Sequence, residues 1–429
     1  MRLALVALVS VLTLAQAAVA DNWPQWRGPN AAGIAAEGDY PVDFSGDENV
    51  TWKVESPGVG SSSPTVWGDA IFVTSIIDGQ DGLSKFDFNG KELWQKKLGP
   101  GLEGKHRNGS GSNPSPVTDG MHVVTYFKSG RVACHDFDGN ELWQVNLQEK
   151  YGENTLWWDL GTSPVLVDGK VVIAVMQSGD SYLVALDVAN KGAEVWKQKR
   201  QYVRPEESDH AYTTPQLANV DGRDVIVTWG ADYLTGHDAK TGEPLWELGP
   251  FNPKEEANWR VIASHAMGDG VAVVPYGRGK FLAGVPLKVE HSGTPQPLWE
   301  EQGEVGPDVP TPIVAGGKVY ILTDTGKVVC RDLKTGDELW ADALPRDKDK
   351  YYASPVLADE KLYFTREDGV VFVADVSDGF KLLTSKDGND MGERIIATPA
   401  PVRDSLLIRG EKHLFRIGGG ETKTAAAKQ

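Results

Sequence analysis

"DLKTGDELW" occupies positions 332–340, and "DAKTGEPLW" occupies positions 238–246. Two looser copies of this phrase read "DFNGKELW" at 87–94 and "DFDGNELW" at 136–143. The aspartate that opens each phrase can accept hydrogen bonds from nearby backbone amides, and the glycine suits a turn position with positive φ. The phrase therefore predicts a β-hairpin, and its recurrence predicts a chain built from repeated units.

Two landmarks give the period of the repeat. The first is the final hydrophobic residue of the phrase, at Trp94, Trp143, Trp196, Trp246, Trp299, Trp340 and Leu383. The second is a small residue followed by proline, at Ser63-Pro64, Ser115-Pro116, Ser163-Pro164, Thr214-Pro215, Thr311-Pro312, Ser354-Pro355 and Thr398-Pro399. The remaining gap contains "SHAMGDG" at 264–270, where we place Ala266 at the proline position. Eight units result, spaced by 43 to 52 residues, a period typical of solenoids and propellers.

Each unit contains four strand-like runs. Apolar runs such as "KVVIAVM" at 170–176 lack strict alternation, as expected for strands that neighbouring sheets cover on both faces. A helical bundle or a Rossmann array would need helical periodicity, and no good helix pattern is present. Four-stranded sheets at this spacing predict an all-β fold, an eight-bladed β-propeller of antiparallel blades.

The two ends of the repeat predict how the ring closes. Only three strands remain after Pro399, whereas the N-terminal segment contains Trp52, which lies 42 residues before Trp94. We therefore expect residues 47–56 to supply the closing strand of blade eight, within a propeller that spans residues 47–418. Such closure joins the ends of the chain and removes the exposed sheet edges.

The outermost segments predict a secreted protein. Residues 1–20 have the basic start, apolar core and small-residue cleavage signal of a secretory peptide. No cysteine stands directly after the cleavage site, which predicts a periplasmic or extracellular protein without a lipid anchor. No later apolar run is long enough to span a membrane. Residues 21–46 are expected to form a strap that Trp23 and Trp26 anchor against the side of the propeller. Residues 419–429 are expected to form a disordered tail.

The net charge of the chain bears on whether it binds nucleic acid. The formal net charge of −17 repels phosphate backbones, which argues against nucleic-acid binding.

The two cysteines, Cys134 and Cys330, belong to units two and six, which lie opposite one another in an eightfold ring. A disulfide needs Cα atoms within about 7 Å of each other. We therefore expect two separate, buried cysteines.

The repeat phrases, the Ser/Thr-Pro unit starts and the N-terminal "NWPQWRGPNAAG" resemble the quinoprotein-like eight-bladed propellers with PQQ-like repeats. The resemblance extends from about Asn22 to about Gly418. One branch of that family contains alcohol and sugar dehydrogenases that use pyrroloquinoline quinone (PQQ) and calcium. The other contains the outer-membrane assembly lipoprotein BamB and many uncharacterised secreted proteins, which keep the propeller without the chemistry. The chain resembles this second branch more, because it lacks the adjacent cysteine pair and the long insertions of many dehydrogenases.

Motifs that carry catalysis or bind metals are scarce. The chain has no HExxH, CxxC, GxxxxGK[ST] or GxSxG motif, so no residue is predicted to be catalytic or to ligate a metal. "DFDGNE" at 136–141 faintly resembles a calcium loop, but it has the register of the other blade turns, which favours a hairpin.

Candidate binding residues come from the connections that lead into the innermost strands. In propellers these connections lie on the face around the central funnel, where ligands usually bind. The candidates are His106, Arg107, Trp157, Trp158, Asp159, His210, Tyr212, Arg260, His265, Asp308, Tyr351 and Arg394, with Asn108, Trp259 and Tyr352 beside them. Aromatic rings, cations and acids together suit a polar ligand with a flat portion. The alternative is that these residues pair with one another and plug the channel.

Three hypotheses for function follow. The first is a secreted, non-catalytic scaffold that binds a protein or a cell-envelope component through the funnel face and needs no cofactor. The second is an oxidoreductase with a divergent site that uses PQQ and calcium. The third is a carbohydrate-binding propeller, suggested by the aromatic residues of the funnel. The sequence leaves the partner, any small polar ligand and the oligomeric state open.

Overall fold

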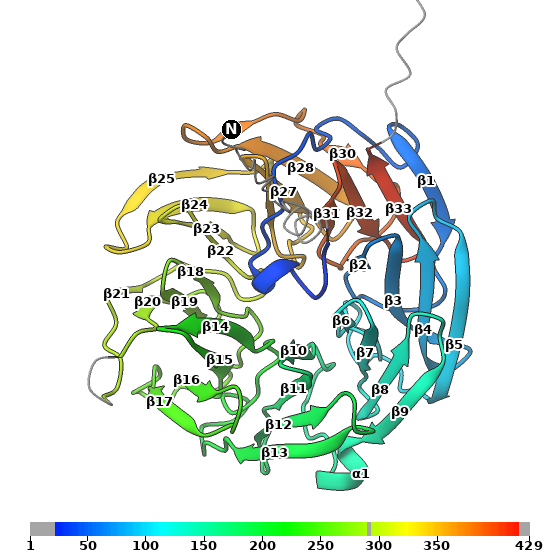
Figure 1. The fold of residues 1–429 in the computed structure, drawn as a ribbon. Helices are drawn as coiled ribbons and strands as arrows, with labels where there is room; N and C mark the ends of the chain where they lie inside the picture. Colours follow the sequence, from blue (N-terminus) through cyan, green and yellow to red (C-terminus); the bar gives the residue numbers. More distant parts are fainter. Residues whose placement is uncertain (1–21, 290–292, 420–429) are drawn as a thin grey trace, which may run out of the picture.

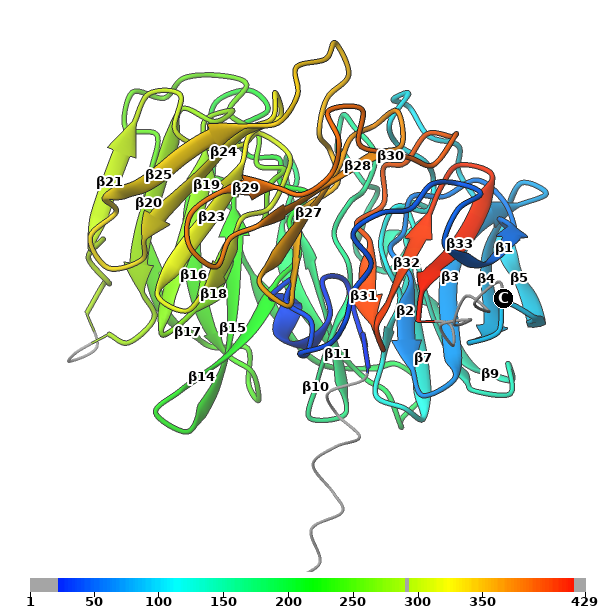
Figure 2. The same cartoon turned by 90° about the horizontal axis from the view of Figure 1, so that it is seen from above.

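The computed structural model describes residues 22–289 and 293–419 (Figures 1 and 2). These residues form eight antiparallel sheets arranged in a ring around a central channel, which confirms the predicted all-β, eight-bladed propeller. The described helical segments are the 3-10 turn η1 (Pro29–Ala31) and one short helix, α1 (Leu147–Tyr151). Neither is long and apolar enough to cross a membrane. The predicted signal peptide and nearly all of the predicted tail lie outside the described residues.

Blades one to four each take four consecutive strands, ordered from the channel outward. Blade one contains β2 (Thr65–Trp67), β3 (Ala70–Ile77), β4 (Gln80–Asp87) and β5 (Glu92–Pro100). Blade two contains β6 (Val117–Thr118), β7 (His122–Tyr126), β8 (Arg131–Asp136) and β9 (Glu141–Asn146). Blade three contains β10 (Val165–Val167), β11 (Lys170–Val175), β12 (Tyr182–Asp187) and β13 (Ala193–Lys199). Blade four contains β14 (Gln216–Val220), β15 (Arg223–Gly230), β16 (Tyr233–Asp238) and β17 (Pro244–Leu248).

Blades five to eight complete the ring. Blade five contains β18 (Ala266–Gly268), β19 (Val271–Tyr276), β20 (Phe281–Pro286) and β21 (Trp299–Gln302). Blade six contains β22 (Ile313–Ala315), β23 (Lys318–Leu322), β24 (Lys327–Asp332) and β25 (Glu338–Ala343). Blade seven contains β26 (Val356–Ala358), β27 (Lys361–Thr365), β28 (Val370–Asp375), and an outer strand split into β29 (Lys381–Leu382) and β30 (Asn389–Asp390). Blade eight contains β31 (Ala400–Val402), β32 (Ser405–Arg409), β33 (His413–Gly418) and β1 (Val50–Glu55).

The N-terminal strand β1 closes the ring, as predicted. It pairs antiparallel with β33, the last strand of the chain, so that Lys53 lies opposite Phe415. The indole N–H of Trp52 donates to the backbone oxygen of Phe88 in blade one at 3.0 Å. Blade eight therefore contains both ends of the propeller and is also attached to blade one.

The repeated phrase forms the predicted turn. Asp332 accepts hydrogen bonds at its Oδ1 from the backbone N–H groups of Lys334 (2.8 Å) and Thr335 (2.9 Å). Gly336 has a φ of 78°, a conformation that favours glycine. The turn before this outer strand is thus built from local hydrogen bonds and one left-handed residue.

The tryptophan that ends the phrase joins one blade to the next. The indole of Trp299, in blade five, donates to the backbone oxygen of Leu333 in blade six at 2.8 Å. A Cβ added to Gly336 would lie 2.6 Å from the Trp299 ring, so this glycine also permits close approach of the neighbouring blade. Trp340 makes no such hydrogen bond among the described residues; its ring centroid lies 5.8 Å from that of Phe380 in the next blade, and its side chain is only half-buried.

The two cysteines occupy the same place in their blades. Cys134 lies opposite Trp143 and Cys330 lies opposite Trp340 in the strand pairing. Both are buried and unbridged, as predicted. Burial raises the pKa of Cys134 to about 12 and that of Cys330 to about 11, so both thiols stay protonated at neutral pH.

The N-terminal strap crosses one end of the channel. Trp23 pairs with Val66 in β2, whereas Ile34 pairs with Leu357 in β26, on blade seven. Between these two points the 3-10 turn η1 lies near the centre of the ring (Figure 1). The expectation that the strap anchors against the side of the propeller is therefore wrong.

Arg27 holds the strap inside the channel. Its guanidinium donates to the backbone oxygens of Thr311 and Pro312 in blade six, both at 2.6 Å, and also to two oxygens of the strap. The side chain is completely buried, and burial lowers the pKa of Arg27 to about 9. Buried carbonyl groups in the channel wall thus find their hydrogen-bond donor in the strap, which is why the segment lies there.

Replacing Arg27 with methionine is expected to lower the free energy of unfolding by about 2–3 kcal/mol, because buried carbonyl groups of blade six lose their donor. Arg27→Lys should recover only part of this loss, since one ammonium group cannot reproduce the fork of donors. Chemical denaturation measures the loss, and limited proteolysis should cut residues 22–35 faster in Arg27→Met. Unchanged stability and proteolysis would show that the buried guanidinium does not hold the strap.

Candidate functional site

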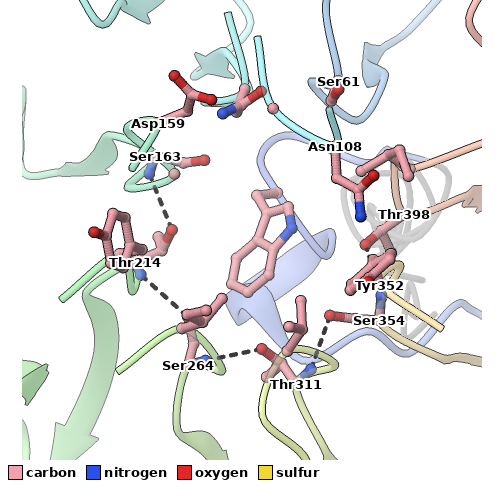
Figure 3. A pocket seen from close by; sticks show the side chains of 18 of the residues that line it. Ser61, Asn108, Asp159, Ser163, Thr214, Ser264, Thr311, Tyr352, Ser354 and Thr398 are labelled. Carbon is pink, nitrogen blue, oxygen red and sulfur yellow. Dashed lines mark hydrogen bonds between the residues drawn. The ribbon is translucent and has the colours of Figure 1, made fainter. Parts of the chain in front are cut away.

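The Ser/Thr residue that starts each unit belongs to a ring of hydroxyl groups around the channel. In seven of the eight steps between blades, the hydroxyl oxygen accepts a hydrogen bond of 2.9–3.2 Å from the backbone N–H of the same position in the preceding blade. Figure 3 shows four of these bonds. The ring comprises Ser63, Ser115, Ser163, Thr214, Ser264, Thr311, Ser354 and Thr398. The repeat needs a hydroxyl here because the side chain links neighbouring blades.

The ring corrects the alignment of blade five. Ser264 occupies the hydroxyl position, and strand β18 begins at Ala266, so His265 occupies the proline position. Our placement of Ala266 there is wrong by one residue. His265 is completely buried, and neither ring nitrogen has a hydrogen-bond partner among the described residues. Burial lowers the pKa of His265 to about 3, so the imidazole is neutral.

A second layer of eight residues lies above the ring, two positions earlier in each blade. Side chains of extended backbone alternate, so residues two apart face the same side. Blades one to three contribute Ser61, Asn113 and Gly161, and blades four to eight contribute Tyr212, Ile262, Val309, Tyr352 and Ile396. The layer therefore has a small or polar side and an apolar, aromatic side.

The two layers enclose a cavity of about 300 Å³ in the centre of the propeller. Trp26 of the strap contributes to its lining from one end. Residues of the funnel-face loops line its mouth, namely His106, Asn108, Gly109, Trp158, Asp159 and Arg260. Asn108, labelled in Figure 3, has a buried Nδ2 with no hydrogen-bond partner among the described residues.

The charged groups at the mouth are paired. Asp159 accepts from Lys128 Nζ at 2.6 Å and from two backbone N–H groups. Arg260 lies 3.4 Å from Asp308 and 3.6 Å from Glu207. Burial raises the pKa of Asp308, an effect that nearby arginines partly offset. The mouth therefore presents balanced charge to the cavity.

Five of the twelve predicted binding residues line this cavity: His106, Trp158, Asp159, Tyr212 and Arg260. Arg107 and Arg394 instead flank Glu367 of blade seven, at 3.2 and 3.3 Å, beside a smaller cavity of about 60 Å³. Asp308 pairs with Arg260 behind the mouth.

The other four candidates do not line the central cavity. Trp157 is exposed, and its ring centroid lies 5.6 Å from that of the buried His210, whose pKa is lowered by burial. Tyr351 packs in the core between blades six and seven. His265 is buried in blade five. The channel thus does not bring all of the predicted residues together.

Strand alternation explains most of the residues that the sequence analysis missed. Tyr352 lies two positions before Ser354 and faces the cavity, whereas Tyr351 lies three positions before it and faces the core. Counting back by two from each hydroxyl would have found Val309 and Ile396 as well. No such pattern pointed to Trp26, which reaches the cavity through the strap.

The cavity residues do not fit PQQ. This cofactor carries three carboxylates and is bound with a metal ion in the dehydrogenases. Among the residues that the structure describes, Arg260 is the only Lys or Arg that lines the cavity, and Asp308 already pairs with it. Nor do residues 22–289 and 293–419 contain three His, Cys, Asp or Glu side chains grouped to hold a metal ion. Burying unpaired carboxylates in such a site would be costly.

Comparison with solved structures finds the same fold in a BamB protein and in two dehydrogenases. BamB from Moraxella catarrhalis has a TM-score of 0.58 at 16% identity, covering 86% of this chain and 99% of that one. A europium-containing methanol dehydrogenase has a TM-score of 0.65 at 12% identity, covering 92% and 88%. The quinohemoprotein alcohol dehydrogenase from Comamonas testosteroni has a TM-score of 0.64 at 11% identity, covering 97% and 83%. At these identities the likeness shows the fold alone.

Comparison of sequences distinguishes between the two branches. The outer membrane protein assembly factor BamB of Burkholderia pseudomallei (strain K96243) is 23% identical over 366 residues, covering 83% of this chain and 84% of that protein. The family model described as "Outer membrane protein assembly factor BamB" matches residues 44–212, 210–384 and 289–414. These matches confirm the predicted resemblance, and together they span residues 44–414, which is nearly the whole propeller. The chain therefore belongs to the family of the outer membrane protein assembly factor BamB.

Proposed function

We propose that this protein is a non-catalytic scaffold that docks a protein partner on its funnel face. The observation that carries the proposal is a set of exposed apolar side chains on loops that lead into four consecutive blades. They are Val59, Leu102, Trp157, Trp158 and Val203. Trp157 and Trp158 are 46% and 41% exposed, and Val203 is 91% exposed. Large exposed aromatic residues are enriched among those that dominate binding energy at protein interfaces.

The repeat does not account for these residues. Five other exposed large hydrophobic residues directly precede the last hydrophobic residue of the phrase on outer strands: Leu93, Leu142, Val195, Leu298 and Leu339. Those positions recur because every blade has the same outer strand. The funnel-face loops differ in sequence from blade to blade, so their apolar residues are not a by-product of the repeated phrase.

Contacts between the loops hold the aromatic residues in place. The indole N–H of Trp158 donates to Glu207 Oε1 at 2.6 Å, and its ring meets that of His106 edge to face, with centroids 5.5 Å apart. Trp157 meets His210 in the same way. Side chains that are already positioned lose little conformational entropy on binding, which favours a docking surface.

The family supports a partner in outer-membrane assembly. The curated relative and one solved structure are BamB proteins, and the relative is described as an outer membrane protein assembly factor. We therefore propose a protein component of that assembly as the partner, and the periplasm as the location. The dehydrogenase alternative has less support, because the cavity does not fit PQQ. Carbohydrate binding is a separate property and does not require the docking surface.

Replacing both Trp157 and Val203 with glutamate is expected to weaken partner binding by at least about tenfold, because two charges would enter an apolar interface. A photo-crosslinking residue at position 157 would first identify the partner in cells, with position 339 as the outer-strand control. The affinity of the purified partner for both forms then measures the effect. Leu142→Glu with Leu339→Glu is the matched control and should bind normally. The docking surface is wrong if no protein crosslinks preferentially at position 157, or if the double variant binds the crosslinked partner as tightly as the parent.

A further inference from the structure

The hydroxyl ring leaves hydrogen-bond donors directed at the central cavity. Each of seven hydroxyl oxygens uses one lone pair to accept a backbone N–H from the preceding blade. Within the described residues, none of the eight hydroxyl groups donates a hydrogen bond to protein. A hydroxyl has one proton and two lone pairs, so each retains a donor and at least one acceptor site. Polar groups buried without partners are costly, which favours an occupant that can bond to them.

One wall of the same cavity is apolar and aromatic rather than polar. The second layer is apolar or aromatic from blade four to blade eight, where Ile262, Val309, Tyr352 and Ile396 are among its residues. Trp26 adds an aromatic surface from the strap. An occupant should therefore have one apolar face and many polar atoms around its edge.

The charged residues and the volume of the cavity restrict which ligands it can bind. Asp159 is paired with Lys128, and Arg260 is paired with Asp308. An ionic ligand would therefore find no free counter-charge among the described residues that line the cavity. The cavity volume of about 300 Å³ is at the lower end of the range for small-molecule sites, which is about 300–1,000 Å³. These features exclude a large or strongly charged ligand.

We propose that the central cavity binds a neutral monosaccharide. The C–H face of the sugar ring packs on the wall formed by Tyr352 and its apolar neighbours, and the sugar oxygens bond to the hydroxyl ring. Asn108 Nδ2, which has no hydrogen-bond partner among the described residues, supplies a further donor at the mouth. This site lies below the proposed docking surface and shares Trp158 with it at the mouth, but the proposal does not rest on the docking surface.

Isothermal titration calorimetry with single ligands tests the proposal. The neutral ligands are glucose, galactose, mannose and N-acetylglucosamine. Gluconate tests the effect of charge, and cyclohexanol provides a ring with one oxygen. We expect at least one neutral sugar to bind with a Kd of about 1 mM or tighter, and both comparison ligands to bind at least about tenfold more weakly. Absence of binding by all four sugars, or tightest binding by gluconate, would overturn the proposal.

Variants of the cavity wall locate the site. Ser61→Leu places a larger side chain in the cavity, and the Ser61 hydroxyl makes no hydrogen bond among the described residues, so the fold should tolerate the change. We expect it to weaken sugar binding by at least about tenfold. Tyr352→Ala, which removes the aromatic wall, should have a similar effect, and Trp157→Ala outside the cavity should have none.

We expect Ser61→Leu to lose sugar binding but to keep the melting temperature and the partner affinity of the parent protein. Sugar binding retained in both Ser61→Leu and Tyr352→Ala would place the ligand elsewhere and overturn the proposal. Because partner affinity is measured on the same variants, failure of the sugar site and failure of the docking surface give different results.

Discussion

A chain that begins at residue 57 is expected to lose cooperative folding, whereas a chain that begins at residue 22 should fold normally. The truncation removes β1 and exposes the whole edge of β33, with which β1 pairs from Val50 to Glu55. It also removes Tyr40 and Phe44, which are buried in the core formed by blades seven, eight and one. An uncovered strand edge favours pairing between molecules, so we expect aggregation as well.

The measurement is size-exclusion chromatography together with thermal unfolding of the two chains. A third chain, which begins at residue 36, separates the two roles of the N-terminal segment. It lacks the part of the strap that crosses the channel but keeps β1, so it should fold with reduced stability. Soluble protein that unfolds cooperatively after removal of residues 22–56 would contradict the shared blade.

Trp299→Ala is expected to lower the free energy of unfolding by about 3–5 kcal/mol, the usual cost of truncating a buried aromatic residue. Trp299 is only 8% exposed, and its indole N–H bonds to blade six. In the sequence, Trp340 occupies the same position of the repeated phrase as Trp299. Because Trp340 is half-buried and its indole makes no hydrogen bond among the described residues, Trp340→Ala should cost only about 1–2 kcal/mol.

Urea denaturation of both variants measures this difference. Gly336→Ala tests the same contact from the other blade, since its new Cβ would lie 2.6 Å from the Trp299 ring. In the Trp299→Ala background, Gly336→Ala should lower the free energy of unfolding by less than it does alone, because the indole ring that its Cβ would clash with is absent. Equal losses at Trp299 and Trp340, or strictly additive effects in the pair, would show that contact between blades does not set the stability.

Local chemistry explains why the fold was predictable. The turn at Asp332 and Gly336 depends on hydrogen bonds within a few residues and on one backbone conformation, both of which the phrase states directly. The recurrence of the phrase then sets the number of blades, and the count of strands at the C-terminal end shows that one is missing. None of these steps needs knowledge of distant contacts.

The binding residues were less predictable because small shifts in register decide where side chains point. A shift of one position separates Tyr352, which lines the cavity, from Tyr351, which lies in the core. The same kind of shift places His265 rather than Ala266 at the proline position of blade five. Loop composition alone identifies the face of the propeller, whereas the hydroxyl ring fixes the register and so identifies the side chains that face the channel.

By itself, the sequence determined the eight blades, the closing strand and the membership of a propeller family, because these follow from a repeated local pattern. Only the tertiary structure decided that the strap crosses the channel and that a cavity with one apolar side lies above it. Arg27 finds the oxygens of Thr311 and Pro312, which are 284 and 285 positions away in the chain. Contacts over such separations depend on how the ring brings its blades together, and no local pattern encodes them.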